Sequence, residues 1–212
     1  GSMMKDLIER RLADPTLPME EAFSQHLKEE ELELPAGQFA LFMNSMYAVD
    51  AYVRDYFRKA ALDALLAEKL PVTVFGEGWE KYSCGDGHSL RREPAVPFAL
   101  SFERIAKAHV LLNVSPIFNR GMHDRVPAGM ANHAVVLTDE NPYLRRTFTG
   151  GKELLFYSLE KPDTLCEQAE RALTDVRLRE KIAASAYETF EREYTWKRRA
   201  EQILAFAEEV EA

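Results

Sequence analysis

Val110-Leu111-Leu112-Asn113-Val114 and Ala134-Val135-Val136-Leu137-Thr138 are the two runs that decide the fold of this chain. Neither run alternates apolar with polar residues, and such continuous runs are typical of parallel strands that are buried on both faces. Residues 122–132, between them, have the pattern of a helix that follows a turn-rich loop. A strand, a helix and a second strand in this order predict one crossover unit of a parallel sheet.

Two further short runs extend this unit in both directions along the chain. Val72-Thr73-Val74-Phe75 precedes it, Leu154-Leu155-Phe156-Tyr157 follows it, and helical segments separate the runs. Another strand is expected near Val96–Phe98. The sequence therefore predicts an α/β fold, in which helices cover both faces of a Rossmann-like parallel sheet.

The expected domain organisation is a helical N-terminal extension with a linker helix over residues 1–68, followed by a Rossmann-like domain over residues 69–212. The extension carries one apolar stripe at the helical spacing of three and four. Its members are Phe39, Phe42, Met43, Met46, Val49, Val53, Phe57, Ala60 and Ala64. A second stripe near the C-terminus predicts a last helix that packs against other helices. Its members are Trp196, Ala200, Ile203, Ala207 and Val210.

Composition and charge exclude several classes of protein. The net charge of −8 disfavours binding to the phosphate backbone of nucleic acids. No run approaches the roughly 18 apolar residues that a membrane span needs. Cys84 and Cys166 are too few for a disulfide framework, so reduced thiols and a cytoplasmic location are expected. The spacing from Cys84 to His88 matches no metal site, and neither a metal nor a cofactor is expected.

Candidate binding residues follow three of the predicted strands, because ligands of open α/β sheets bind at the carboxyl ends of the strands. They are Gly76, Gly78 and Trp79 after the first strand, Asn113, Ser115, Arg120, Gly121, His123 and Arg125 after the second, and Thr138, Asp139, Glu140 and Asn141 after the third.

Each group also has a plainer interpretation. The glycines near Trp79 fit an ordinary turn between strand and helix. Asp124 and Arg125 fit a local ion pair or a helix cap, and Asp139 to Asn141 fit caps as well as acceptors for ribose hydroxyls. The loop Ser115–Arg125 is expected to hold an anion, because free N–H groups where the next helix starts favour phosphate and two arginines add charged donors.

Several segments together resemble the C-terminal domain of group-1 glycosyltransferases, with spore-maturation-type proteins as the nearest branch. They are residues 106–114, 121–126, 130–131, 134–139, 151–157 and 194–196, with Arg199-Ala200. Coverage runs from about residue 70 to residue 205.

The resemblance implies a GT-B enzyme, which has two Rossmann-like domains and a cleft between them. Its C-terminal domain holds a nucleotide sugar, such as a UDP-sugar, as the donor substrate and needs no cofactor. By resemblance, the loop after Phe75 and the loop Ser115–Arg125 would face the diphosphate and the sugar, and residues 139–141 would lie near the donor. Charge stabilisation of the departing diphosphate would assist transfer of the sugar to an unknown acceptor.

The sequence departs from the family in two respects. Ala128 stands where many relatives have the glutamate that contacts the donor ribose, and Arg120 stands at its usual partner position. Mostly helical residues also stand where the acceptor-binding Rossmann-like domain should precede. Two interpretations stay open: the donor-binding half of a glycosyltransferase that works with an N-terminal acceptor domain, or a non-catalytic GT-B-like binding or interaction module.

Overall fold

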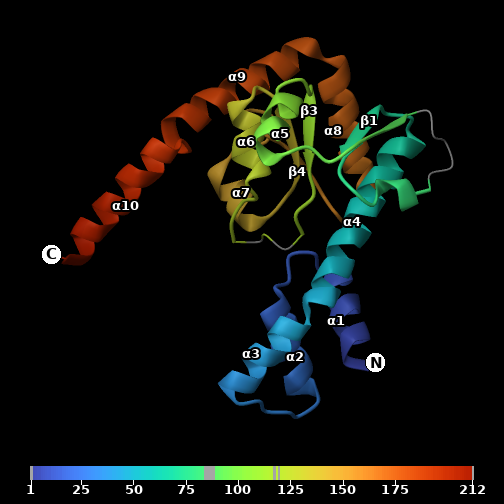
Figure 1. The fold of residues 1–212 in the computed structure, drawn as a ribbon, viewed down its shortest axis with the longest axis vertical. Coiled ribbons are helices and arrows are strands. Elements are labelled where there is room, and N and C mark those ends of the chain that lie inside the picture. The colour runs from blue at the N-terminus through green and yellow to red at the C-terminus, as the bar shows by residue number, and fades with distance from the viewer. Residues whose placement is uncertain (1, 84–88, 117, 119, 212) are drawn as a thin grey trace.

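The computed structural model describes residues 2–83, 89–116, 118 and 120–211. An N-terminal helical part precedes an α/β unit, and a last helix extends away from that unit (Figure 1). The N-terminal helices are α1 (Ser2–Ala13), α2 (Met19–Glu29), α3 (Ala36–Ser45) and α4 (Tyr47–Ala67). The strands are β1 (Val72–Phe75), β2 (Leu90–Glu93), β3 (Val110–Asn113), β4 (Val135–Asp139) and β5 (Leu155–Tyr157). The later helices are the 3-10 turn η1 (Trp79–Lys81) and α5 (Phe98–Ile105), α6 (Arg125–Ala131), α7 (Pro142–Thr147), α8 (Pro162–Thr174), α9 (Val176–Glu193) and α10 (Trp196–Glu211).

The four strands expected from the sequence all form, and all their pairings are parallel. In the described part of the chain, β3, β4 and β5 make one sheet in that order. Strand β1 pairs with β2 in a separate sheet, in which Val72 lies opposite Leu90. The sequence therefore predicted the strands and their direction correctly, although they do not share one hydrogen-bonded sheet.

The partner of β1 lies where no strand was expected. Strand β2 covers Leu90–Glu93, whereas the additional strand was expected near Val96–Phe98, where the structure instead begins helix α5 at Phe98. Strand β2 was missed because it is an edge strand with two exposed arginines and a single buried apolar residue, Leu90. A strand of four residues with a single apolar side chain shows neither a continuous apolar run nor an alternation of apolar and polar residues.

Alternate residues of β4 and β5 face the two sides of the sheet, as the two-residue period of a strand requires. Val135 and Leu137 pack with Tyr157 into a core beneath helices α4, α8 and α9. Val136 and Phe156 pack on the opposite side with residues of α6, α7 and α9. Both faces are thus covered by helices, as the unbroken apolar runs predicted.

Gly129 lets α6 approach the sheet closely. A Cβ atom at this position would lie 2.4 Å from Cγ2 of Val136 and 3.0 Å from Cδ2 of Leu111. Both contacts are with strands of the rigid core, so the neighbouring atoms have little room to move away. The glycine lowers the intrinsic stability of a helix, but here it is required by packing.

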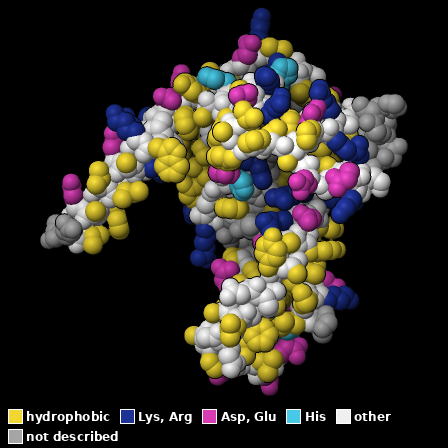
Figure 2. Space-filling model, in the orientation of Figure 1, with side chains coloured by type: hydrophobic (Ala, Val, Ile, Leu, Met, Phe, Trp, Pro, Cys, Tyr) yellow, Lys and Arg dark blue, Asp and Glu magenta, His cyan; other side chains and the backbone are white. Residues whose placement is uncertain are grey.

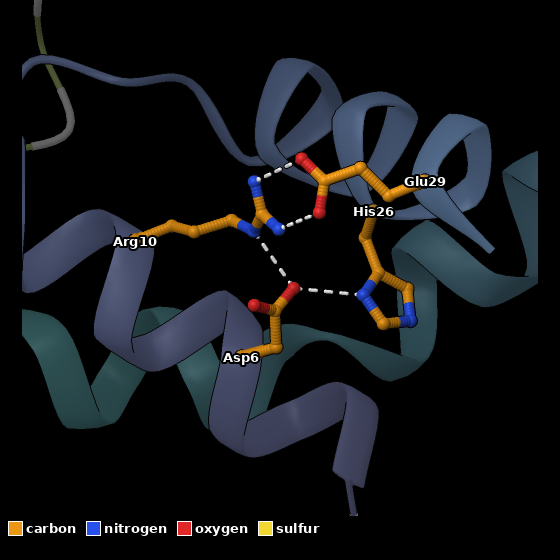
Figure 3. Close-up of polar contacts among 4 residues, drawn as sticks. All are labelled: Asp6, Arg10, His26 and Glu29. Atoms are coloured by element: carbon orange, nitrogen blue, oxygen red, sulfur yellow. Dashed lines mark hydrogen bonds and ion pairs between the residues drawn. The ribbon is translucent and has the colours of Figure 1, made fainter.

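Helices α1 and α2 are joined by a polar network at their surface (Figure 3). Arg10 donates from Nε to Asp6 at 2.7 Å and forms a second, two-pronged contact with Glu29. Nδ1 of His26 lies 2.7 Å from Oδ2 of Asp6. The hydrogen bond from Arg10 is the main reason why the pKa of Asp6 lies below its ordinary value.

The long apolar stripe of the N-terminal part is divided between two helices. Helix α3 ends at Ser45 and α4 starts at Tyr47, and the buried Met46 lies between them. One continuous helix was expected from this stripe, and that expectation was wrong. The turn at Met46 leaves the spacing of the apolar residues along the sequence unchanged, so the sequence pattern does not show where one helix ends and the next begins. Helix α3 has no buried residue among its described positions, whereas α4 buries Val53 and Phe57.

Helix α4 belongs to both parts of the molecule. Near its start, Val49 packs with α1 and α2, and Asp50 accepts a 2.7 Å hydrogen bond from the buried Arg11 of α1. Further along, Phe57 and Leu65 pack in the main core with the sheet and α8. The chain therefore passes from the N-terminal helices into the α/β unit without leaving this helix (Figure 1).

The expected packing of the last helix is wrong for this chain. Helix α10 projects from the end of α9, and hydrophobic side chains line its length (Figures 1 and 2). Trp196 is 90% exposed and Ile203 is 68% exposed. The apolar stripe is present as the sequence showed, but no other described element of the chain covers it.

Replacing Gly129 with alanine should destabilise the fold by about 1–3 kcal/mol, because the new methyl group would overlap Val136 and Leu111. Helix propensity alone predicts the opposite sign. Gly37→Ala in α3 is the control, because a Cβ there meets no atom within 4 Å. Urea unfolding of both variants measures the difference. A Gly129→Ala protein as stable as the wild type would contradict the close approach of α6 to the sheet.

The backbone amides of α10 should exchange with solvent faster than those of α9. An isolated helix of this length is marginal in water, and α10 has almost no packing partner to stabilise it. Hydrogen exchange followed by mass spectrometry can compare residues 199–210 with residues 182–190. Equal protection of the two segments would show that another surface covers α10 in solution.

Candidate functional site

A cluster of buried polar side chains lies at the carboxyl ends of β3 and β4. Asn113 ends β3, Thr138 and Asp139 end β4, and Ser115 follows β3 directly. All four residues are buried. Because β3, β4 and β5 are parallel, their carboxyl ends meet at one edge of the sheet, which is where ligands of α/β proteins bind.

Asn113 is the centre of this cluster. Its Nδ2 donates to Oγ1 of Thr138 at 2.9 Å, and its Oδ1 accepts from the Ser115 hydroxyl at 3.0 Å and from the Arg125 guanidinium at 2.8 Å. The Tyr157 hydroxyl donates to the Asn113 backbone carbonyl at 3.0 Å. Through its side chain and its backbone carbonyl, this one residue thus connects the ends of β3, β4 and β5 with the first residue of α6.

Asp139 is a buried carboxyl group with an altered pKa. Its Oδ1 accepts the Ser115 backbone N–H at 2.7 Å. Burial raises the pKa of Asp139 to about 7, and the Ser115 N–H and the charge of Arg125 offset only part of that effect. Near neutral pH, this carboxyl group is therefore partly protonated, and its protonation removes one of the two carboxylate charges that act on Arg125, the other being that of Asp124.

Arg125 is a half-buried cation with a neutral partner. Its guanidinium donates to Asn113, and no carboxylate among the described residues lies within the 4.0 Å of an ion pair. Burial is the main cause that lowers the pKa of Arg125, and the positive charge of Arg58 is the next. A partly buried guanidinium that lacks a counter-ion is suited to bind an anion.

The start of α6 does not supply the free N–H groups expected from the sequence. The backbone N–H of Arg125 donates to Nδ1 of His123 at 3.2 Å, and the backbone N–H of Val126 donates to the His123 carbonyl at 3.0 Å. The amide of Ala128 donates to the Asp124 carbonyl, and Pro127 has no N–H. The loop therefore satisfies these donors itself, so any anion must be held by side chains instead.

His123 lies in the same loop as a neutral acceptor. Burial, followed by the charge of Arg125, lowers its pKa, although Asp124 acts in the opposite direction. Nδ1 lies close to both the backbone N–H of Arg125 and the carboxylate of Asp124. It can either accept a hydrogen bond from the first or, when protonated, donate one to the second. The lowered pKa favours the neutral ring that accepts from Arg125.

Asn141 and Glu140 have structural partners. Asn141 caps α7 by accepting the Leu144 N–H at 2.8 Å, and its Nδ2 donates to the carbonyls of Phe118 and Gly121. Glu140 pairs with Arg145 at the surface. For Asn141 the structure confirms the capping interpretation, and the same side chain holds the loop Ser115–Arg125 in place.

The remaining candidates lie apart from this cluster. Gly76 and Gly78 have positive φ angles, of 124° and 88°, which allow the turn after β1. Trp79 donates to the Phe75 carbonyl at 3.2 Å and packs in a separate hydrophobic cluster. No hydrogen bond among the described residues joins Gly76, Gly78 or Trp79 to Asn113. Arg120 is exposed. The roles of these four residues in binding stay predictions.

Two residues of this edge were missed from the sequence. Tyr157 was recognised only as the end of a strand, although that position itself placed it at the edge with Asn113. Arg58 lies on α4, and only the fold shows that its charge acts on Arg125. Residues 84–88, which carry the Cys84 and His88 pattern, lie outside the described residues. Across the described residues there is no cluster of potential metal ligands and no helix long and apolar enough to cross a membrane.

A protein family described as glycosyl transferase-like matches residues 54–205. The chain belongs to this glycosyl transferase-like family. The match begins inside α4 and ends in α10, so it includes the whole α/β unit. No curated protein matches the sequence.

Solved structures share the fold of this glycosyl transferase-like chain. Anabaena Alr3699/HepE, in complexes with UDP-glucose, with UDP and glucose, and with UDP, is similar with a TM-score of 0.59 and 12% sequence identity. Each alignment covers 71% of this chain and 44% of the HepE chain. The chain thus spans less than half the length of that protein. Its parallel sheets flanked by helices are similar to GT-B glycosyltransferase domains.

Replacing Asp139 with asparagine should flatten the pH dependence of stability. The folded pKa of about 7 lies above the ordinary value of 3.8, so the contribution of this group to the free energy of unfolding is complete below pH 3.8 and is lost as the pH rises through 7. Between pH 5 and 8 the wild type should lose on the order of 2 kcal/mol through this group. Urea unfolding at both pH values measures the loss. An equal loss in Asp139→Asn would contradict the raised pKa.

Proposed function

We propose that this chain is the donor-binding half of a nucleotide-sugar-dependent glycosyltransferase and that the edge around Asn113 and Arg125 holds the donor. Arg125 carries the proposal: it is a half-buried cation at the carboxyl edge of a parallel sheet, and its hydrogen-bond partner is neutral. The family match supports a sugar-transfer reaction, and the HepE complexes with UDP and UDP-glucose support a nucleotide-sugar donor.

In this proposal Arg125 binds the diphosphate of the donor. Negative charge accumulates on the diphosphate as the bond to the sugar carbon breaks, and a guanidinium in a partly desolvated site stabilises that charge. Asn113 orients the guanidinium, since its Oδ1 accepts from Arg125 while its Nδ2 is fixed by Thr138. Protonation of Asp139 frees Arg125 from a competing negative charge.

The nucleoside should be bound less firmly than the phosphates. Ala128 is half-buried on α6, at the position that corresponds by resemblance to a ribose-binding glutamate, and Arg120 is exposed at its partner position. Without these two carboxylates the ribose loses charge-assisted hydrogen bonds of about 1.5–3 kcal/mol each. We therefore expect UDP to bind weakly, mainly through its phosphates.

Binding of the acceptor substrate requires a second domain in addition to the donor-binding half proposed here. Sugar transfer in a GT-B enzyme takes place in a cleft between two domains, so an N-terminal acceptor domain is the expected partner. The reaction is proposed for the cytoplasm, which agrees with the expectation of reduced thiols at Cys84 and Cys166. Membership of the spore-maturation-type branch belongs to this proposal, on the residues that carry the resemblance.

A second function is favoured by a separate observation. Helix α10 exposes Trp196, Ile203, Phe206 and Val210, and an apolar surface of this kind often marks a protein interaction site. A GT-B-like interaction module that has lost donor binding would keep the fold and this surface. Ligand binding at Arg125 discriminates between the two functions.

UDP should bind to the wild-type protein with millimolar or somewhat better affinity, and Arg125→Ala should weaken binding by about 1.5–3 kcal/mol, because a charged hydrogen bond to phosphate is lost. Isothermal titration calorimetry measures both affinities. Lys181→Ala on the exposed side of α9 removes the same charge and should leave the affinity unchanged. If the folded wild type binds no UDP at millimolar concentration, the donor site is rejected and the interaction module is favoured.

A further inference from the structure

Helix α4 brings a second arginine to the edge of the sheet where Asn113 lies. Phe57 of α4 and Tyr157 of β5 line the same small cavity. The hydroxyl of Tyr157 donates to the carbonyl of Asn113, whose side chain accepts from Arg125. Arg58 follows Phe57 directly, so its backbone is fixed by the packing of Phe57 in the main core. The helix that begins among the N-terminal helices therefore contributes a cation next to the candidate donor site.

The contacts of Arg58 within the chain leave its charge available. Its one ion pair among the described residues is with Asp55, at 3.7 Å and one turn away on the same helix. The side chain of Asp55 is 77% exposed, and that of Arg58 is 36% exposed. A long ion pair with an exposed partner contributes little energy, so a stronger anion can replace it without a large cost.

Arg58 and Arg125 act on each other through their charges. The positive charge of Arg58 lowers the pKa of both Arg125 and His123. No described carboxylate lies within ion-pair distance of Arg125, and Asp124 and Asp139, whose charges act in the opposite direction, each have a smaller effect on its pKa than Arg58. Two cations that the fold holds near each other in this way are stabilised when an anion binds between them.

We propose that a phosphate or diphosphate anion is held between Arg58 of α4 and Arg125 of α6, so that the N-terminal helical part contributes directly to the donor site. The identity of the anion as the diphosphate of a nucleotide sugar rests on the proposed function, whereas the anion site itself rests on the two arginines. Helix α4 is thus more than a linker, because it supplies one of the two cations.

An arginine is suited to this position for a physical reason. A guanidinium presents several donors in a plane and can contact two phosphate oxygens together, while an ammonium group acts as a single point charge. The packing of Phe57 and Val53 against the main core prevents α4 from moving away from the sheet. The backbone of Arg58 is therefore positioned before the ligand arrives, which reduces the entropy lost on binding.

The test uses the full chain with two probes, UDP and inorganic pyrophosphate, and measures their affinities by calorimetry. Arg58→Gln should weaken the binding of both probes about 10-fold, and Arg58→Lys should recover part of the loss. The matched control is Lys59→Gln, on the same helix, because Lys59 pairs with Asp63 and lies over the ring of Tyr82. Unchanged affinity for both probes in Arg58→Gln would overturn the proposal.

The two probes separate this inference from the proposed function. If pyrophosphate binds with the expected dependence on Arg58 and Arg125 while UDP does not bind, the shared anion site stands and the nucleotide-sugar assignment fails. If UDP binds and depends on Arg125 alone, the donor site stands and the role of Arg58 is wrong. If neither probe binds at millimolar concentration, both proposals fail.

A measurement without ligand tests the position of Arg58. Because the charge of Arg58 lowers the pKa of His123, Arg58→Gln should raise that pKa, and Lys59→Gln should not. NMR titration of the histidine ring protons, assigned with His123→Gln, gives both values. A pKa of His123 that is unchanged in Arg58→Gln would place Arg58 away from the site and contradict the proposal.

Discussion

The packing of helix α4 against the parallel sheet is the constraint on which the rest of the molecule depends. Val53, Phe57, Ala61 and Leu65 of α4 lie in one core with residues of β4, β5 and α8. The start of the same helix is tied to α1 through Asp50 and the buried Arg11. A single rigid helix therefore fixes the N-terminal helices relative to the sheet, and it also fixes where the charge of Arg58 lies.

The candidate site follows from how the edge of the sheet satisfies its polar groups. Burying a polar side chain is costly unless it is hydrogen-bonded, and Asn113, Ser115 and Thr138 satisfy one another. Asp139 is satisfied by one backbone N–H, but its charge stays unfavourable, as its pKa of about 7 shows. Arg125 donates a hydrogen bond to the side-chain oxygen of Asn113, which does not neutralise its positive charge. A cation without an ion-pair partner among the described residues therefore lies at this edge, within a chain whose net charge is −8.

The sequence predicted much of the fold because the decisive strands are buried on both faces. Uninterrupted apolar runs identified β1, β3, β4 and β5, and their alternation with helices indicated parallel pairing. The edge strand β2 was missed because its exposed arginines resemble a loop. The end of α3 at Ser45 was missed because a bend at Met46 leaves the period of three and four unchanged. The projection of α10 was missed because an amphipathic pattern shows an apolar face without showing what covers it.

The sequence by itself determined the strand order along the chain, the carboxyl edge at which polar residues gather, and the membership of Asn113, Ser115, Arg125, Thr138 and Asp139 in that edge. Only the tertiary structure decided which donors and charges are available there. The amides at the start of α6 bond to their own loop, Asn141 is occupied as a cap, and the charge of Arg58, on a helix distant in sequence, acts on Arg125. The physical reason is that hydrogen bonding and electrostatic interaction depend on distances between atoms, which residues far apart in sequence acquire only when the chain has packed.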